Sequence, residues 1–309
     1  MRRNLAVLIL VTLLANSLNG LPIVRGHKGR CLQSKNESVL LYTVLGQASQ
    51  TYYKMLDLMV AAFLNTTLHP VHVMVLAHES WRQPMLNMGF RHQVVLVNDS
   101  TYLDGKGEMF RKPMAPALKM RVFDLFPSIF KYDIVIFSDV DIVVNTDILS
   151  YVGPLHSQHM SVVGEGFFND ARWSVRTRDA QALSELQARH IKTFSTGFLV
   201  FRPSSRIAQI FEKAYASYTA RPRGSVYEQG HLVDAVVDGI DRLSYTLTNY
   251  SRLGLHKILQ TGIRGVQKYA LWHAAGNNLP SEKKLDLMET VVGWGFPKRM
   301  KGLPRCGHT

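Results

Sequence analysis

Two carboxylates, Asp139 and Asp141, stand one residue apart just after the apolar run at residues 134–137 and Ser138. That run is β-branched and aromatic, which is typical of a strand buried on both faces of a parallel sheet. In open α/β sheets ligands bind beyond the carboxyl ends of the strands, so both side chains are expected to face a bound molecule. Two hard oxygen ligands suit Mg²⁺ or Mn²⁺ better than Zn²⁺. The alternative is ordinary polar loop chemistry after a strand.

The segments before this strand alternate between apolar runs typical of strands and apolar spacing typical of helices. Apolar runs at 38–45, 71–77 and 93–97 read as strands, and residues 51–64 and 84–88 have helical character. This β-α-β-α-β order predicts an α/β protein with a parallel sheet. Further elements are expected at 116–126 (helix), 161–165 (strand), 179–189 (helix within a polar insertion or lid, 167–192), 198–201 (strand), 204–218 and 231–237 (helices), and 268–273 (strand).

The composition describes a globular chain with a strong basic excess. Of its 309 residues 46% are hydrophobic, and 36 Lys plus Arg against 23 Asp plus Glu give a formal charge of +13. Such a balance favours anionic partners. No zinc-finger spacing and no basic stripe interleaved with aromatics accompanies it, which argues against nucleic acid. We find no P-loop, hydrolase elbow or dinucleotide glycine motif. Without repeats or low-complexity linkers, one domain is expected at 37–292, followed by a basic tail at 293–309.

The N-terminal residues 1–20 have the basic and apolar regions of a secretory signal peptide, with a short membrane anchor as the alternative. Entry into the secretory pathway would place the protein in the Golgi or ER lumen or outside the cell. There Cys31 and Cys306, the only cysteines, could pair if the chain ends meet; this pairing is left open. Glycosylation sequons begin at Asn36, Asn65, Asn98 and Asn249.

The order of motifs from residue 39 to 276 resembles the retaining glycosyltransferases of family 8, the group of glycogenin and bacterial lipopolysaccharide galactosyltransferases. Asp139-Val140-Asp141 is similar to the family's metal-binding triplet. Ser195-Thr196-Gly197 resembles its Asn-Ser-Gly strand beside the donor sugar, and Glu228-Gln229-Gly230 its Asp-Gln-Gly. The segment from His273 to Gly276 is similar to the histidine-glycine turn that gives a third metal ligand. A second family of extracellular nucleotide-sugar transferases, which includes plant cell-wall xylosyltransferases, is a rival for the family identity.

This resemblance implies a GT-A fold, Rossmann-like and with a mostly parallel sheet flanked by helices, and a role for each matched residue. The metal ligands would be Asp139, Asp141 and His273, and the histidine favours Mn²⁺ over Mg²⁺. Glu228 and Gln229 would lie beside the anomeric carbon. The implied donor-binding residues are Thr43, Tyr52, Lys119, Ser138, Val140, Glu165, Ser195, Thr196, Gly197 and Gly276.

The implied function is metal-dependent, retaining transfer of a sugar from a nucleoside diphosphate sugar. The donor would be a UDP-linked hexose or pentose, and the acceptor a carbohydrate, glycoprotein or lipid-linked glycan.

Two departures from the family pattern bear on this function. Glu228 replaces an Asp, and Leu279-Pro280-Ser281 stands where the family has Lys-Pro-Trp, so a diphosphate-binding lysine is missing there. Lys283 or Lys284 could substitute for it. These departures motivate the alternative of a non-catalytic nucleotide-sugar or carbohydrate-binding protein.

Overall fold

The computed structural model describes residues 37–46, 49–67, 69–97, 115–152, 155, 159–167, 180–188, 192–220, 228–239, 244–248, 251–253, 255–266, 269–275 and 279–294. The predicted signal or anchor at 1–20 and both cysteines lie outside these residues, as do Gly276 and the sequon asparagines 36, 98 and 249. Within the described part of the chain, no helix combines the length and the apolar character that crossing a membrane requires.

The centre of the fold is a seven-stranded sheet with the order β3-β2-β1-β4-β7-β6-β8. Four of its neighbouring pairs are parallel, and β7 is antiparallel to both β4 and β6. The strands are β1 (Val39–Val44), β2 (Val71–His78), β3 (Gln93–Val97), β4 (Ile134–Ser138), β6 (His159–Phe167), β7 (Lys192–Phe201) and β8 (Ser244–Thr248).

The predicted α/β class, with a mostly parallel sheet flanked by helices, is therefore confirmed. Strands β1 to β3 of the predicted β-α-β-α-β opening are parallel, and the antiparallel strand is β7, which lies beyond that opening. Strand direction follows from how the chain crosses between strands, and the apolar pattern of a strand buried on both faces carries no sign of direction.

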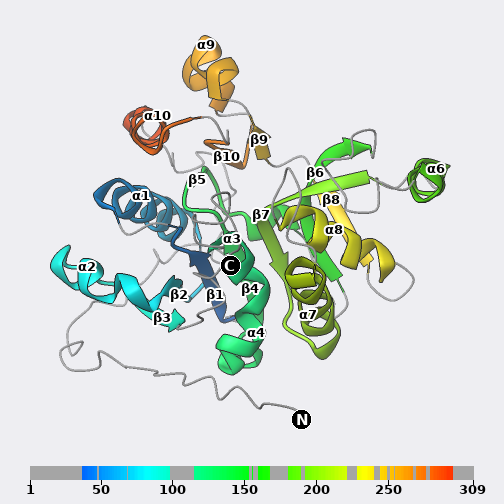
Figure 1. Cartoon of the computed structure of the whole chain (residues 1–309). Coiled ribbons are helices and arrows are strands. Elements are labelled where there is room, and N and C mark those ends of the chain that lie inside the picture. Colours follow the sequence, from blue (N-terminus) through cyan, green and yellow to red (C-terminus); the bar gives the residue numbers. More distant parts are fainter. Residues whose placement is uncertain are drawn as a thin grey trace, which may run out of the picture.

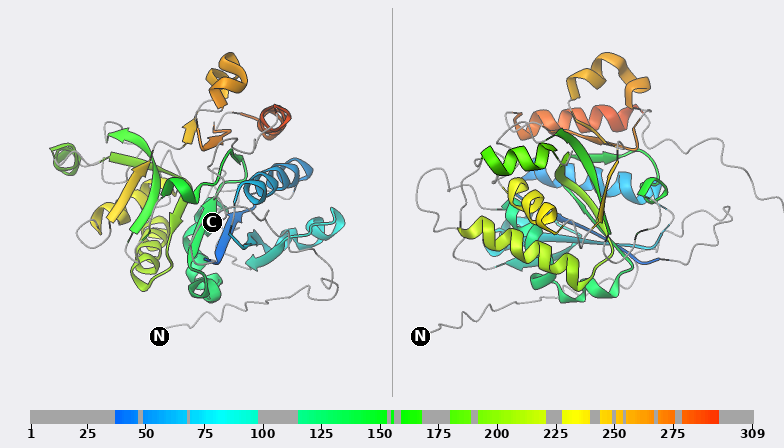
Figure 2. Two further views of the ribbon diagram at one scale, coloured as in Figure 1. Left: turned by 180° about the vertical axis from the view of Figure 1, so that it is seen from behind. Right: turned by 90° about the vertical axis from the view of Figure 1, so that its right-hand side faces the viewer.

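Helices cover both faces of this sheet, as Figures 1 and 2 show. Alternate side chains of β1 enter two separate cores: Leu41 packs with α1 (Gln50–Thr66) and α10 (Ser281–Gly293), whereas Leu40 packs with α7 (Ser205–Ala220) and α8 (Gln229–Asp238). Besides the segments between residues 115 and 125, the other described helical elements are η1 (Glu79–Trp81), α2 (Arg82–Asn87), η5 (Pro127–Lys131), α5 (Leu149–Val152), α6 (Ala180–Ala188) and α9 (Leu255–Val266).

A second, three-stranded sheet was not predicted. It has the order β5-β10-β9, formed by β5 (Ile142–Val144), β10 (Leu271–His273) and β9 (Ser251–Leu253). The strand expected at 268–273 begins only at Leu271. Because β5 follows β4 after a turn of three residues, the chain passes from the large sheet to the small one at the carboxylate pair. Figure 1 shows the small sheet beside α9 and α10 at one end of the molecule.

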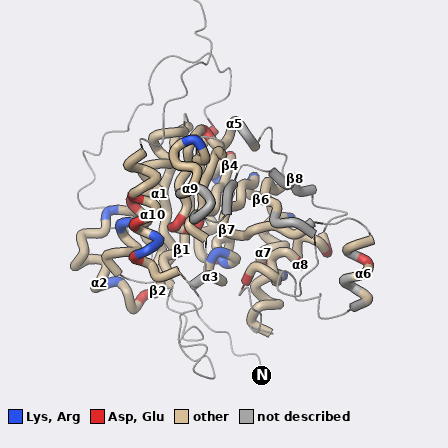
Figure 3. Tube along the Cα trace, turned by 90° about the horizontal axis from the view of Figure 1, so that it is seen from above, with Lys and Arg blue, Asp and Glu red and all other residues tan. Residues whose placement is uncertain are grey.

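The helix predicted at 116–126 is divided into three short segments. These are α3 (Ala115–Leu118), the 3₁₀ turn η4 (Lys119–Arg121) and α4 (Val122–Leu125). The tighter winding of η4 buries three consecutive side chains, including Lys119 and Arg121, where a regular helix would expose part of that turn. Elsewhere, the charged residues that Figure 3 colours are scattered among the described elements instead of gathered on one face.

Candidate functional site: an acidic metal centre between two sheets

Asp139 and Asp141 are held by the backbone at the junction of the two sheets. Their intervening residue, Val140, is buried in the core on the α1 side. The Asp139 N–H donates to the carbonyl of Gly197 in β7 at 2.8 Å, and the Asp141 carbonyl accepts from Ala274 N–H, after β10, also at 2.8 Å. Each acid is thus anchored to a different sheet, and the two carboxylates keep a fixed relation.

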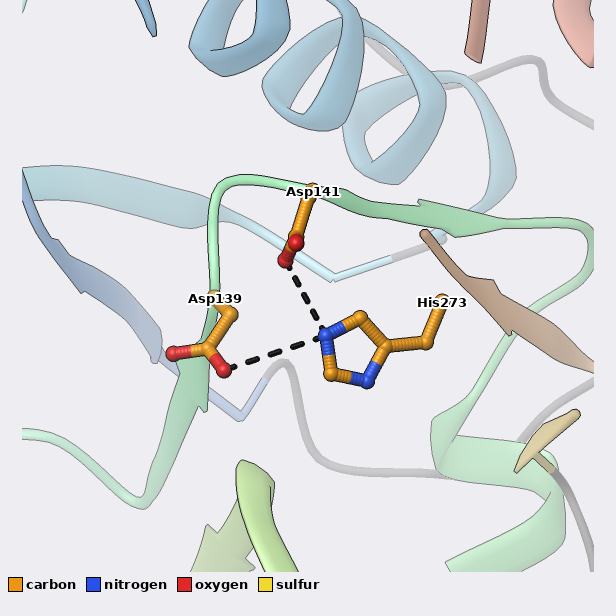
Figure 4. A group of neighbouring side chains, drawn as sticks. All are labelled: Asp139, Asp141 and His273. Atoms are coloured by element: carbon orange, nitrogen blue, oxygen red, sulfur yellow. Dashed lines mark hydrogen bonds and ion pairs between the residues drawn. The ribbon is translucent and has the colours of Figure 1, made fainter. Parts of the chain in front are cut away.

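His273 joins this pair through the register of β10 on β5, which sets it opposite Ile142. Its Nε2 lies 3.0 Å from Asp141 Oδ1 and 3.9 Å from Asp139 Oδ2. Figure 4 shows the imidazole nitrogen directed at both carboxylates. One ligand atom from each residue fits within a span of 4.8 Å.

These spacings fit a divalent cation. Ligand bonds of about 2.1 Å in an octahedral shell separate neighbouring ligand atoms by about 3 Å and opposite ones by about 4.2 Å. The observed separations of 3.0 and 3.9 Å lie within that range. The three residues predicted as ligands are therefore brought together with the right donor types.

Gly197 leaves room for this cluster. A Cβ at position 197 would lie 2.7 Å from Asp139 Oδ2 and 2.9 Å from His273 Cε1. Both distances are shorter than van der Waals contact, so any side chain at this position would push into the ligand atoms. The glycine predicted on the donor side thus forms one wall of the metal centre.

The electrostatics of the cluster are balanced by two lysines. Burial would raise the pKa of Asp141, but His273 and Lys284 outweigh it and hold that pKa well below its usual value. Burial likewise opposes the charged form of His273, yet Asp141 raises the histidine pKa overall. Burial raises the pKa of Asp139, with Lys119 acting in the opposite direction. Two carboxylates held this close together are groups that a bound divalent cation would neutralise in place of the lysines.

Of the two lysines considered as substitutes, Lys284 is the one that reaches the cluster. It reaches from α10 to Asp141, with Nζ donating to Oδ2 at 2.7 Å, whereas Lys283 is exposed. Burial would lower the pKa of Lys284, but the Asp141 carboxylate raises it. From the sequence, Lys283 and Lys284 were equally possible substitutes, because α10 was not predicted. The helical spacing of Leu285, Met288 and Val291 after Pro280 would have indicated this helix.

The residues predicted on the donor side, on β7 and next to α8, are connected to the acidic cluster through Lys119. Thr196 N–H donates to Gln229 Oε1 at 3.4 Å, and Ser195 Oγ accepts from Gly197 N–H at 3.2 Å. Lys119 Nζ lies 2.7 Å from Glu228 Oε1 and 3.5 Å from Asp139 Oδ1. The residues predicted on the sugar side therefore form one connected group.

The predicted nucleotide-side residues lie along β1, β4 and α1. Thr43 is fully buried in β1, and its hydroxyl has no hydrogen-bond partner among the described residues. Tyr52 is half-buried near Lys284; burial is the main cause of its raised pKa and Lys284 opposes it. Its neighbour Tyr53 is instead buried against Phe90, with ring centroids 5.1 Å apart. Of the two tyrosines, Tyr52 is thus the one that faces the cluster.

Three other predicted positions have different outcomes. Ser138 is buried at the end of β4, and its hydroxyl donates to the Asp139 carbonyl at 3.0 Å. Glu165 lies in β6, but its side chain is outside the described part of the structure, as is the whole of Gly276.

Comparison with known proteins gives structural likeness only. No protein-family model and no curated protein sequence matches this chain. Among solved structures it is similar to mouse xyloside xylosyltransferase 1 at 12% identity and a TM-score of 0.47, covering 79% of this chain and 99% of that one. It is also similar to the galactosyltransferase LgtC in complex with donor and acceptor sugar analogues, at 13% identity and a TM-score of 0.48, covering 81% and 95%.

A third similar structure is the bifunctional glycosyltransferase WbbM, at 14% identity and a TM-score of 0.45, covering 88% of this chain and 53% of that one. All three TM-scores lie below 0.5.

Proposed function

We propose that this protein is a metal-dependent glycosyltransferase of the GT-A type that uses a nucleoside diphosphate sugar, UDP-linked, as donor. The observation that carries the proposal is the convergence of Asp139, Asp141 and His273, with ligand atoms within 4.8 Å, at the carboxyl end of a buried central strand. This is the end of an α/β sheet at which ligands bind.

Asp139, Asp141 and His273 are the residues that would hold the cation. A bound divalent ion supplies Lewis-acid stabilisation of the negative charge that develops on a leaving diphosphate. A nitrogen ligand among two carboxylates favours Mn²⁺, with Mg²⁺ as the second choice. Lys284 holds an ammonium beside Asp141, and its flexible side chain would allow that ammonium to pair with a phosphate oxygen of the donor.

The remaining residues are assigned to the two parts of the donor, the nucleotide on one side of the metal ligands and the transferred sugar on the other. Tyr52, which is half-buried, would contact the nucleotide, and the buried residues Thr43, Ser138 and Val140 would support its site. Ser195 to Gly197, with Glu228 and Gln229, would lie against the transferred sugar. In the retaining reaction the anomeric C–O bond to the diphosphate breaks, and a bond from the acceptor oxygen forms on the same face. The acceptor proton passes to the departing phosphate oxygen, so no protein base is required. Glu228 and Gln229 would stabilise the positive charge that develops at the anomeric carbon.

The test is a panel of UDP-sugars assayed for transfer and hydrolysis with Mn²⁺. We expect turnover of at least one donor, loss of turnover with EDTA, and loss in Asp139→Ala and Asp141→Ala variants whose circular dichroism is unchanged. Turnover that survives in either variant would contradict the metal assignment. Binding of UDP without turnover of any donor would favour the non-catalytic alternative instead.

We further propose that the protein acts in the lumen of the secretory pathway on a carbohydrate, glycoprotein or lipid-linked glycan. The basic and apolar N-terminus and the four sequons support this location. Of these sequons, Asn65 lies exposed in the last turn of α1, about 20 Å along the helix from Tyr52. A glycan there would leave the site open. Digestion of the secreted protein with an N-glycosidase, followed by mass spectrometry of the Asn65 peptide, tests this assignment.

A further inference from the structure

Lys119 is a buried lysine whose hydrogen-bonding capacity is already used inside the protein. It is 2% exposed, and its ammonium lies over the Phe137 ring, 4.4 Å from the centroid. Three acceptors surround Nζ: Glu228 Oε1 at 2.7 Å, the Thr196 carbonyl at 3.1 Å and Asp139 Oδ1 at 3.5 Å. An ammonium has three N–H groups, so these acceptors leave none for a phosphate.

The same contacts fix one oxygen of Glu228. Oε1 accepts from Lys119 Nζ and, at 3.4 Å, from the Thr196 hydroxyl. Among the described residues no partner is found for the second oxygen, Oε2. Glu228 is also the N-cap of α8, yet its side chain makes no capping bond to that helix. A carboxylate is stabilised when it accepts hydrogen bonds at the N-terminus of a helix. The Glu228 carboxylate turns away from that position because it is held by Lys119.

We propose that Lys119 is a positioning residue of the donor site. One ammonium binds the metal-side Asp139 and the sugar-side Glu228 together, which fixes the separation of the two ends of the site and presents Glu228 Oε2 to the sugar hydroxyls. This inference rests on the proposed glycosyltransferase function. It differs from the direct donor contact that the sequence resemblance implied for Lys119.

The lengths of the two side chains allow a stringent test. Glu228→Asp withdraws the carboxylate by about 1.5 Å, one carbon–carbon bond. Lys119→Arg has a longer side chain, whose guanidinium forms bidentate pairs with carboxylates. Each single variant changes the combined length of the two side chains, and thereby disturbs their contact. The double variant Lys119→Arg with Glu228→Asp combines a longer with a shorter side chain and should therefore restore the contact.

The experiment compares the wild type with Lys119→Met, Lys119→Arg, Glu228→Asp and the double variant. For each we would measure UDP affinity with Mn²⁺ by calorimetry and kcat on the donor that the wild type prefers, at 25 °C, with melting curves recorded in parallel. We expect Lys119→Met to keep UDP affinity within about threefold while kcat falls at least about tenfold, because UDP lacks the sugar that Glu228 binds. The double variant should recover most of the kcat that Glu228→Asp loses.

Each outcome decides the inference. A tenfold or larger loss of UDP affinity in Lys119→Met would mean that Lys119 binds the nucleotide, which overturns the positioning role. A pair that serves stability alone would change the melting temperature but leave kcat of the folded protein at 25 °C unchanged, which also overturns it. If Lys119→Met does not fold, the recovery of kcat in the double variant decides the question, and its failure refutes the inference. Failure of the wild type to bind UDP at all would refute the proposed function instead.

Discussion

Replacing Gly197 with alanine is the sharpest test of the metal centre, because it adds one methyl group at a known place. Gly197 lies in β7 with a backbone conformation that alanine can adopt, so the backbone itself is not strained. The added Cβ would lie 2.7 Å from Asp139 Oδ2 and 2.9 Å from His273 Cε1, a shortfall of roughly 0.7 and 0.5 Å against ordinary contact. Both obstructing atoms are at the ends of side chains that can rotate, so the fold accommodates the methyl by displacing the ligands.

Displacements of this size exceed the tolerance of about 0.2 Å that metal–ligand distances allow. Disturbing the support of metal ligands typically weakens metal affinity 10- to 100-fold. We therefore expect Gly197→Ala to bind Mn²⁺ about 10- to 100-fold more weakly, or about 1.4 to 2.7 kcal/mol, while its melting temperature changes by only a few degrees. Electron paramagnetic resonance of free Mn²⁺ during titration measures this directly.

The matched control is Gly293→Ala at the end of α10, where an added Cβ meets nothing within 4 Å. It should bind Mn²⁺ as the wild type does. If Gly197→Ala also binds Mn²⁺ within threefold of the wild type, the cation is not held between Asp139 and His273, and the geometric reasoning is wrong.

Three further predictions concern stability. Leu41→Ala, at a fully buried position of β1, should lower the free energy of unfolding by about 2–5 kcal/mol in urea denaturation, whereas Leu64→Ala at a position 41% exposed should change it by less than about 0.5 kcal/mol. Asn145→Ala removes Nδ2 bonds to the Val266 and Tyr269 carbonyls, at 3.2 and 3.0 Å, and should cost about 1–3 kcal/mol in the same assay. Because the folded-state pKa of Asp141 is depressed, metal-free protein should lose stability as the pH falls below about 4 toward that pKa; urea midpoints for Asp141→Asn should show a weaker loss.

The central strand and the acids after it could be predicted because their signals are local. The run from Ile134 to Phe137 is apolar on both faces, and β4 is buried at every residue. The alternation up to β3 was equally clear. Strands β5 and β9 have only three residues each, which is too short for a period to be recognised, although Ile142, Val143 and Val144 are all β-branched.

The residues of the site were predicted from the resemblance of the sequence motifs to a known family pattern. This resemblance predicted the metal-ligand group. It brought Asp139, Asp141 and His273 together correctly, although 132 residues separate the histidine from its hydrogen-bonding partner Asp141. The setting of Lys119 was not predictable, because its burial depends on the 3₁₀ turn that interrupts the expected helix. Sequence spacing gives the face of a regular helix and fails where the winding changes.

The position of His273 on the small sheet has a consequence for how the protein is made. Asp139 and Asp141 leave the ribosome long before His273, and β10 can pair with β5 only after residues 271–273 have been synthesised. Domains fold as their residues emerge, at about 5–20 residues per second, so the two acids wait on the order of ten seconds for their third ligand. A nascent chain or a fragment that ends before β10 lacks His273 and therefore cannot assemble this cluster. Any ability to bind a cation there would be acquired late, and it would mark a chain whose C-terminal part has folded onto the rest.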